Sequence, residues 1–343
     1  MKKILIVKLS AIGDVMVTSP FPRLIKEIFP ESKIHHLVMS HCRVVTENNP
    51  WVDGLIVTKF FPTKNKLKDI ILFINLVIKL RKQKFDIAYI FHRNFLFQLL
   101  CFLAGIRNIV GFSSSFNFFY KKHLDYKFTI NRSEQEADLI RLSGISIRNV
   151  DHLDFYNNEF SLSYSIASLL PKNFILCNPG GGNPHAPADN RLWPIDKYAE
   201  LIKRAPIPFV IVGSGDADFK LACQLNNLLD EISVINLVNK TTFSDVSLIL
   251  KKAKLYLGND SSLIFLAAAV GTTNIGLYGP TQSEAASPVG GNHIPVIGHS
   301  PCSPCYNPFE GIKGQMYLCQ DNKCMQNISV DMVLKKINDL LLT

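Results

Sequence analysis

The chain alternates short apolar runs with longer amphipathic segments along most of its length. This alternation is typical of β-α units around a mostly parallel sheet, because buried parallel strands are apolar throughout whereas the covering helices are apolar on one side. The first half predicts strands at Lys3–Leu9, Lys33–Met39, Gly54–Thr58, Phe85–Phe91 and Asn108–Gly111. The second half predicts strands at Asn173–Asn178, Pro208–Gly213, Ser233–Asn236, Leu255–Gly258 and Thr273–Tyr278.

The segment between the two series, Phe155–Leu170, follows neither pattern and is followed by Pro171. We therefore predict two α/β domains, over residues 1–165 and 166–343, with a last helix that packs back on the first domain. A length of 343 residues suits two domains of ordinary size. Ligands of such folds bind at the carboxyl ends of the strands, so we expect the site in the cleft between the domains.

The net charge of +9 is confined to the first half of the chain. Residues 1–160 hold 23 Lys and Arg against 14 Asp and Glu, whereas residues 161–343 hold 14 of each kind. This asymmetry indicates an acidic partner for the first domain, such as nucleic acid, an anionic membrane or a phosphorylated substrate. The basic residues form no zinc-finger, RRM or helix-turn-helix pattern, which argues against nucleic acid.

Targeting and membrane signals are weak. The chain starts like a signal peptide, but Lys8 interrupts the apolar run and no small-residue cleavage site follows. The longest apolar run, Ile70–Ile78, is too short to span a bilayer. We expect a cytoplasmic protein that works at the inner face of the cytoplasmic membrane. Basic residues flank the apolar run within Lys59–Lys84, which fits either a membrane-facing element or a buried helix with solvated ends.

The loop after the first strand carries the candidate catalytic group. It runs from Ser10 to Asp14 and places a carboxylate at the carboxyl end of a buried strand, beside Gly13, which can adopt backbone angles that other residues avoid. Taken alone, an Asp at the start of a helix is most often an N-cap, which is the alternative. The loop lacks G-x-G-x-x-G, which argues against a nicotinamide or flavin dehydrogenase.

Several loops of the second domain have the composition of an anion-binding site. Gly180 and Gly181 follow a strand, where glycines let backbone N–H groups approach phosphate oxygens. Arg191 precedes a helix and offers planar donors to a diphosphate, although a surface salt bridge is the alternative. The remaining candidates are Asp216 and Asp218, as ribose ligands or helix caps, the helix start Asp260, Ser261 and Ser262, and the turn Gly279, Pro280 and Thr281.

The eight cysteines fall into two groups. Four are scattered in apolar surroundings and are expected in the core: Cys42, Cys101, Cys177 and Cys223. The other four cluster near the C-terminus: Cys302, Cys305, Cys319 and Cys324. In a cytoplasmic protein such a cluster favours a structural Zn or Fe site, with free thiols or disulfides as the alternatives.

Taken in order, these motifs resemble glycosyltransferase family 9, the ADP-heptose:lipopolysaccharide heptosyltransferases. The matching segments are Ala11–Asp14, Phe85–Ala88, Asn108–Phe112, Arg191–Pro194, Gly258–Asp260, Ala267–Ala269 and Gly279–Thr281. The resemblance implies the GT-B fold, with two Rossmann-like domains facing each other across a cleft. It also implies an inverting glycosyl transfer of the EC 2.4 class that needs no catalytic metal.

Roles for individual residues follow from the same resemblance. It implies that Asp14 is the general base, in an acceptor loop with Ser10 and Gly13. The donor would be ADP-heptose, and the acceptor a hydroxyl of the lipid A core, on Kdo or a heptose. Arg191 would stabilise the leaving ADP and Asp218 would contact the ribose, together with amides of the helix start and the Thr281 turn. Some family members bind iron through four cysteines, which supports a metal at the cysteine cluster.

The chain departs from the family pattern at one motif. The family reads Asp-Thr-Gly followed by His three residues after the Gly, whereas this chain has Ser262 in place of the Gly and Phe265 in place of the His. Phenylalanine neither donates a hydrogen bond nor carries charge. A family 9 transferase with another nucleotide sugar, and a catalytically silent nucleotide-sugar binding protein, are therefore the alternative hypotheses.

Overall fold

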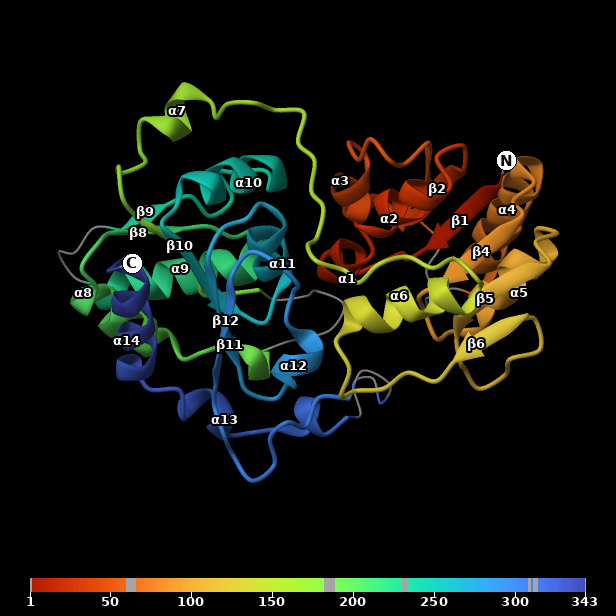
Figure 1. Cartoon of the computed structure of the whole chain (residues 1–343). Coiled ribbons are helices and arrows are strands. Elements are labelled where there is room, and N and C mark those ends of the chain that lie inside the picture. The colour runs from red at the N-terminus through yellow and green to blue at the C-terminus, as the bar shows by residue number, and fades with distance from the viewer. Residues whose placement is uncertain are drawn as a thin grey trace. The chain divides into compact units, whose positions relative to one another are not determined.

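The computed structural model describes residues 2–59, 66–181, 189–229, 234–307, 310 and 314–342. The chain divides into two compact units, Met1–Tyr156 and Asn157–Thr343 (Figure 1). The division falls close to the irregular segment that the sequence pattern marks as a boundary, somewhat before the predicted position at residue 165.

The first unit is built on one parallel six-stranded sheet. Its strands are β1 (Lys3–Val7), β2 (Lys33–Met39), β3 (Gly54–Thr58), β4 (Ile87–Ile90), β5 (Asn108–Phe112) and β6 (Lys122–Leu124). Their order is β3-β2-β1-β4-β5-β6, so the winding direction reverses between β1 and β4. In doubly wound sheets ligands bind at the carboxyl ends of the strands at this switch point. The Asp14 loop follows β1 and therefore lies there.

Helices connect the strands of the first unit. They are α1 (Ile12–Val17), α2 (Phe21–Ile28), η1 (Ser40–Cys42), α3 (Arg43–Thr46), α4 (Lys66–Gln83), α5 (Phe95–Leu103) and α6 (Arg132–Leu142). Asn94 caps α5 by accepting a hydrogen bond from Leu96 N, and Asn131 caps α6 by accepting one from Ser133 N. One core cluster joins the sheet to α4 and α5, with Leu80, Leu100 and Ile109 fully buried.

The second unit repeats the same winding. Its strands are β7 (Ile175–Asn178), β8 (Phe209–Ile211), β9 (Ile235–Asn236), β10 (Leu255–Asn259), β11 (Asn274–Tyr278) and β12 (His293–Ile297). All pair in parallel in the order β12-β11-β10-β7-β8-β9, with the switch point between β7 and β10. The glycine-rich loop after β7 and the Asp260 segment after β10 therefore leave the sheet at adjacent strand ends.

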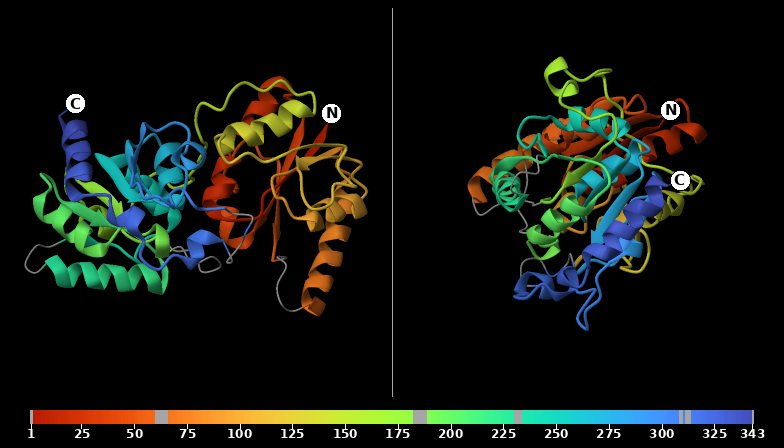
Figure 2. Two further views of the ribbon diagram at one scale, coloured as in Figure 1. Left: turned by 90° about the horizontal axis from the view of Figure 1, so that it is seen from below. Right: turned by 90° about the vertical axis from the view of Figure 1, so that its left-hand side faces the viewer.

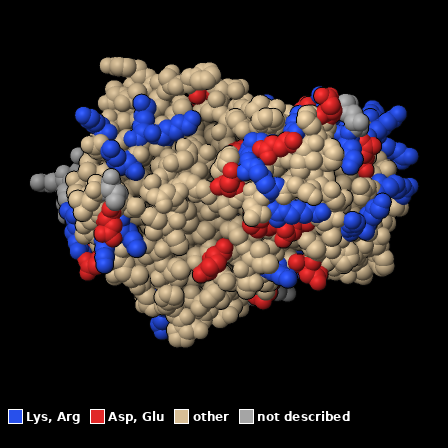
Figure 3. Space-filling model, in the orientation of Figure 1, with Lys and Arg blue, Asp and Glu red and all other residues tan. Residues whose placement is uncertain are grey.

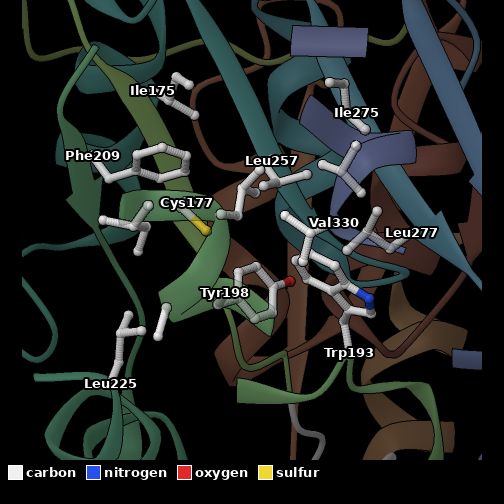
Figure 4. Packing of buried hydrophobic residues seen from close by; sticks show 14 of the residues in the cluster. Ile175, Cys177, Trp193, Tyr198, Phe209, Leu225, Leu257, Ile275, Leu277 and Val330 are labelled. Atoms are coloured by element: carbon white, nitrogen blue, oxygen red, sulfur yellow. The ribbon is translucent and has the colours of Figure 1, made fainter. Parts of the chain in front are cut away.

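The helices of the second unit pack around this sheet (Figure 2). They are α7 (Tyr164–Ala167), η2 (Asp189–Arg191), α8 (Ile195–Arg204), α9 (Gly215–Leu229), α10 (Phe243–Lys252), α11 (Ser262–Ala269), α12 (Ser283–Ala286), η4 (Gln315–Leu318), α13 (Lys323–Gln326) and α14 (Val330–Leu341). Figure 4 shows Trp193 and Tyr198 packed among strand residues of this core. The last helix, expected against the first domain, contributes Val330 and Val333 to the core of its own unit.

The predicted strands are present in the structure, several of them shorter than predicted at their ends. One of them, Ser233–Asn236, begins outside the described residues. The sequence pattern misses two strands, β6 and β12, which lie at sheet edges. The residues of β6 are exposed or half-buried, and β12 holds a single fully buried residue, so neither strand needs a continuous apolar run. Among the described helices, none combines the length and the apolar character that crossing a bilayer requires.

Candidate functional site

Asp14 lies in the first turn of α1, directly after the carboxyl end of β1. Asp14 is not the N-cap that the sequence offered as an alternative, because Ala11 holds that position and Asp14 is the third residue of the helix. Its Oδ2 accepts a hydrogen bond from Ala11 N at 3.2 Å, which is the reciprocal bond of a capping box. The other oxygen, Oδ1, accepts from Arg132 Nη1 at 2.5 Å. The side chain of Asp14 is 33% exposed, so the carboxylate remains accessible while it is held by two donors.

The two other predicted residues of this loop have plainer roles. Ser10 and Gly13 are half-buried beside Asp14. Gly13 lies inside α1 and is absent from the glycines with positive φ, so the expectation of unusual backbone angles there is wrong. Gly13 follows the helical path that any residue can take.

A buried ion pair in the first unit, between Lys8 and Glu136, acts electrostatically on Asp14. Lys8 Nζ donates to Glu136 Oε1 at 2.9 Å and to the carbonyl oxygen of Phe91 at 3.2 Å. Burial raises the pKa of the Glu136 carboxyl to about 7, against the opposing effect of the Lys8 charge. In the sequence, Lys8 stands out only as an interruption of an apolar run. Its partner, 128 positions away on α6, has no local sequence signal.

The charges around Asp14 determine its protonation state. Burial raises the pKa of the Asp14 carboxyl. The positive charges of Lys8 and Arg132 and the hydrogen bond from Ala11 N together lower it by more than burial raises it, so the pKa is below its ordinary value. The carboxylate is therefore ionised across the neutral range. His92 is not a second base, because burial lowers its pKa to about 3 and its Nε2 accepts a hydrogen bond from Leu9 N at 2.7 Å.

In the second unit, Asp218 holds the glycine loop against the start of α9. Its Oδ1 accepts from Gly181 N at 3.3 Å, and its Oδ2 accepts from Ser214 N at 3.0 Å. Gly181 has a φ of +110°, and a Cβ on Gly180 would overlap Asp218 Oδ1, so both positions require glycine. The later part of the loop, from Gly182 to Asn183, lies outside the described residues.

These contacts give Asp218 the capping arrangement that the sequence allowed as an alternative. The carboxylate serves backbone N–H groups of two loops, and its contact with a ribose remains a prediction. Asp216 lies exposed in the first turn of α9. An Asp at that position also favours the helix through the positive end of its dipole.

Asn259 ties the glycine loop to the neighbouring core. Its side-chain amide donates to the carbonyl oxygens of Pro179 at 2.7 Å and Gly180 at 3.0 Å. Its Oδ1 accepts from Trp193 N at 3.0 Å and Tyr198 Oη at 3.2 Å. Asn259 is 1% exposed, so these bonds are shielded from water. In the sequence, Asn259 belongs to a segment that resembles a family motif, but its residue type predicts no role.

Arg191 lies largely buried beside Asp260. Its Nη1 is 3.5 Å from Asp260 Oδ2, and its guanidinium lies 4.2 Å from the centre of the Tyr306 ring. The two side chains are 19% and 6% exposed, so this is not the surface salt bridge that the sequence left open. Arg191 Nε is buried and has no hydrogen-bond partner in the described part of the chain. The guanidinium thus keeps a donor available.

The start of α11 and Thr281 follow the carboxyl ends of two neighbouring strands, β10 and β11. Ser261 is the N-cap, but its side chain makes no capping hydrogen bond, and α11 continues from Ser262. Thr281 Oγ1 is buried without a hydrogen-bond partner among the described residues, whereas the Ser261 hydroxyl faces the buried hydroxyl of Tyr256. Ser261 also lies next to the glycine loop, because a Cβ on Gly181 would be 2.6 Å from Ser261 Cβ. Buried hydroxyls are normally paired, so Thr281 Oγ1 has hydrogen-bonding capacity that the described residues leave unused.

The turn before Thr281 serves packing instead. A Cβ on Gly279 would be 2.5 Å from Met325 Sδ and 2.8 Å from Cys324 Sγ. The carbonyl oxygen of Pro280 accepts hydrogen bonds from Cys305 N at 2.9 Å and Tyr306 N at 2.8 Å. Gly279 and Pro280 therefore fasten the cysteine-bearing segment to the sheet and place Tyr306 under Arg191.

The four clustered cysteines are free thiols with graded exposure. Cys302 is exposed, Cys305 and Cys319 are half-buried and Cys324 is buried. Burial, together with the charges of the other three thiols, raises the pKa of Cys305 to about 11. The described residues nevertheless include no group of three or more His, Cys, Asp or Glu side chains arranged to hold a metal ion. The scattered cysteines are buried as expected, except Cys223, which is exposed on α9.

Comparison with known proteins assigns the chain to a family. The model of "Glycosyltransferase family 9 (heptosyltransferase)" matches residues 74–312. The chain belongs to glycosyltransferase family 9. It is therefore a glycosyltransferase, and its two Rossmann-like units are those of the GT-B fold.

Relatives of known description agree with this family 9 membership. The chain is 26% identical over 293 residues to lipopolysaccharide heptosyltransferase 3 of Escherichia coli, covering 82% of this chain and 85% of that protein. The family 9 structure from Veillonella parvula superposes with a TM-score of 0.81 and 21% identity, covering 99% of this chain and 97% of that one. The E. coli ADP-heptose LPS heptosyltransferase II superposes with a TM-score of 0.73 and 22% identity, covering 100% and 99%.

Proposed function

We propose that this family 9 enzyme transfers a heptose, with inversion, from ADP-heptose to a hydroxyl of the lipopolysaccharide inner core. The observation that carries the proposal is a pair of buried polar atoms near the carboxyl ends of the second sheet that have no hydrogen-bond partner among the described residues, Arg191 Nε and Thr281 Oγ1, together with the start of α11, where no side chain caps the helix. The names of the relatives, which are lipopolysaccharide heptosyltransferases, supply the sugar and the acceptor class. The acceptor is lipid A carrying Kdo or a first heptose, reached from the cytoplasm at the inner membrane face.

The second unit has the chemistry of a nucleotide diphosphate site. A helix start with an uncapped Ser261 presents backbone N–H groups, which together carry partial positive charge. Arg191 adds a full positive charge that Asp260 balances when no ligand is bound. Both groups stabilise the negative charge that develops on ADP as it leaves. Asp218 holds the glycine loop through the hydrogen bond from Gly181 N. Gly180 and Gly181 have no side chains that would block the phosphates.

The first unit supplies the base. In the transfer, the acceptor oxygen forms a bond to the anomeric carbon, its proton passes to the Asp14 carboxylate, and ADP leaves with the electron pair of the broken carbon–oxygen bond. A base must be ionised before it accepts a proton, and Lys8 and Arg132 keep Asp14 in that form. The reaction as written requires no metal or other cofactor.

Replacing Asp14 by Asn tests the base. Loss of a general base lowers turnover about 100-fold to 10,000-fold, whereas binding of ADP to the second unit should persist. The matched control is Asp138→Asn on α6, a half-exposed carboxylate that pairs with Arg141 at 2.7 Å. Both are measured as heptose transfer from ADP-heptose to a defined truncated core. Turnover of Asp14→Asn equal to that of the control would remove Asp14 as the base.

A different nucleotide sugar is the second candidate, and it rests on Phe265. This residue stands where the family has His and is 3% exposed, so a buried side chain without a hydrogen-bond donor replaces the His of the family. Thermal shift against ADP-, GDP- and UDP-sugars separates the donors, because a ligand that binds only the folded protein raises its melting temperature. Binding without turnover on any acceptor would instead indicate a silent binding protein.

A structural Zn or Fe at Cys302, Cys305, Cys319 and Cys324 stands as a separate proposal. Besides burial, the charges of the other three thiols raise the pKa of Cys305, so the four lie in one region, but as placed they do not form a ligand set among the described residues. Binding would thus require the segment to rearrange around the ion. Elemental analysis of the purified chain, with Cys302→Ser/Cys305→Ser as the comparison, tests this.

A further inference from the structure

Helix α4 presents an apolar face to solvent. Ile70, Ile71, Ile74 and Ile78 are 55%, 53%, 50% and 49% exposed. At about 100° per residue these four side chains fall within about a quarter to a third of the helix circumference. We call them the isoleucine face. An isolated exposed Ile needs no explanation, but four on one side of one helix form a patch.

The opposite side of α4 is firmly held. Leu76 and Leu80 are 4% and 0% exposed and belong to the core cluster of the first unit, with Phe73 and Val77 packed against it. The helix is therefore fixed on the sheet, and the isoleucine face is its outer side rather than a frayed segment. Figure 2 shows α4, in orange, at the margin of the first unit.

Basic side chains border the isoleucine face. Lys79, Arg81 and Lys82 in the last turns of α4 are exposed, as is Lys84 just beyond it. The helix has one acidic residue, Asp69, which is half-buried. Figure 3 shows Lys and Arg side chains gathered along the edge of the molecule where Figure 1 draws α4. An apolar face with a basic border is the pattern of a helix that lies in a bilayer interface.

We propose that the isoleucine face of α4 docks on an anionic phospholipid surface. The isoleucines enter the headgroup boundary while Lys79, Arg81 and Lys82 contact acidic headgroups. The positive charge around the isoleucine face favours an anionic surface over a second copy of the chain. A two-fold interface would place the basic borders of both copies against each other, where they repel. The proposal does not depend on the transferase site, since it concerns binding to lipid without donor or acceptor.

The test is flotation of the full chain with vesicles of phosphatidylcholine and phosphatidylglycerol, compared with phosphatidylcholine alone. Substituting Ile70→Gln, Ile74→Gln and Ile78→Gln together removes the apolar face and keeps good helix formers. Each half-exposed isoleucine should contribute about 5-fold to vesicle affinity, so the triple variant should bind about 100-fold more weakly. The control, Leu169→Gln/Leu228→Gln/Leu342→Gln, removes exposed leucines of the second unit and should bind like the wild type.

A second variant isolates the charge. Lys79→Gln/Arg81→Gln/Lys82→Gln should bind anionic vesicles about 100-fold more weakly, at roughly 5-fold per charge, and should lose the preference over neutral vesicles. Unchanged binding of the isoleucine triple variant overturns the proposal. So does a concentration-dependent dimer that only this variant abolishes, because the face would then be an interface between copies. Asp14→Asn should float with vesicles as the wild type does, which separates this proposal from the proposed reaction.

Discussion

Replacing Lys8 by Met tests the buried ion pair beneath the proposed catalytic chemistry. Lys8 Nζ and Glu136 Oε1 are 2.9 Å apart, and their side chains are 9% and 2% exposed. Methionine keeps most of the volume but removes the cation, and Glu136 Oε2 already has no hydrogen-bond partner within the described residues. Breaking one side of a buried pair costs about 3–5 kcal/mol. We expect a loss of free energy of unfolding of about that size above neutral pH.

The loss should depend on pH, with a sign set by Glu136. Burial raises the pKa of this carboxyl from 4.5 to about 7 although Lys8 opposes the shift. A carboxyl that holds its proton more tightly in the folded state makes the protein less stable as pH rises between the unfolded and folded pKa values. In the wild type this decline ends near the folded pKa of about 7. Without Lys8 the folded pKa is higher, so the decline of about 1.4 kcal/mol per pH unit continues beyond it.

Urea denaturation followed by far-UV circular dichroism at about pH 6 and about pH 8 measures both effects. Lys8→Met should lose more stability at the higher pH. The double variant Lys8→Met/Glu136→Leu removes both charges and should recover most of the loss, because an apolar pair replaces a buried ion pair at little cost. Equal destabilisation at the two pH values, or a double variant no more stable than the single one, would refute the assigned protonation of Glu136.

Two further substitutions test the two sites. Thr281→Val removes a buried hydroxyl that has no partner among the described residues, so the free protein should be as stable as the wild type or more stable. Calorimetry should show ADP binding weakened by about 5-fold to 10-fold. Unchanged ADP affinity would show that this hydroxyl does not face the nucleotide. Arg132→Gln removes a charge that lowers the pKa of Asp14, so the acid limb of kcat/KM should move to higher pH, by roughly one unit or less because the pair is partly exposed. A limb that stays in place in Arg132→Gln would contradict control of Asp14 by this arginine.

Local pattern was sufficient for most of the fold. The central strands of both sheets are buried on both faces, so each is an apolar run that a sequence displays directly, as Ile4–Val7 and Leu255–Leu257 do. The edge strand β6 has no such run because its residues are exposed or half-buried. Glycine positions were also predictable in part. Gly181 does need its positive φ, whereas Gly13 lies in an ordinary helix.

The site was predictable only where its chemistry is local. Asp14 and the start of α11 directly follow strand ends, and Arg191 precedes a helix, so all three could be chosen from the sequence. Lys8 could not be chosen, because its role depends on the ion pair with Glu136 on α6, and only the fold brings these two residues together. The apolar run of α4 shows the same limit. Its periodicity fits a buried helix and an interfacial one equally, and only tertiary packing shows which side of it stays uncovered.

The environment of Asn259 has a consequence for which residues this position tolerates. Its amide donates to two carbonyl oxygens and its oxygen accepts from two donors, so both ends of the side chain are used. Aspartate has no N–H to give, serine is too short to span both sides, and glutamine adds a methylene to a site that is 1% exposed. The choice of asparagine is therefore dictated by the backbone around it, before any sugar nucleotide binds. A change there would disconnect the glycine loop, Trp193 and Tyr198 in a single step.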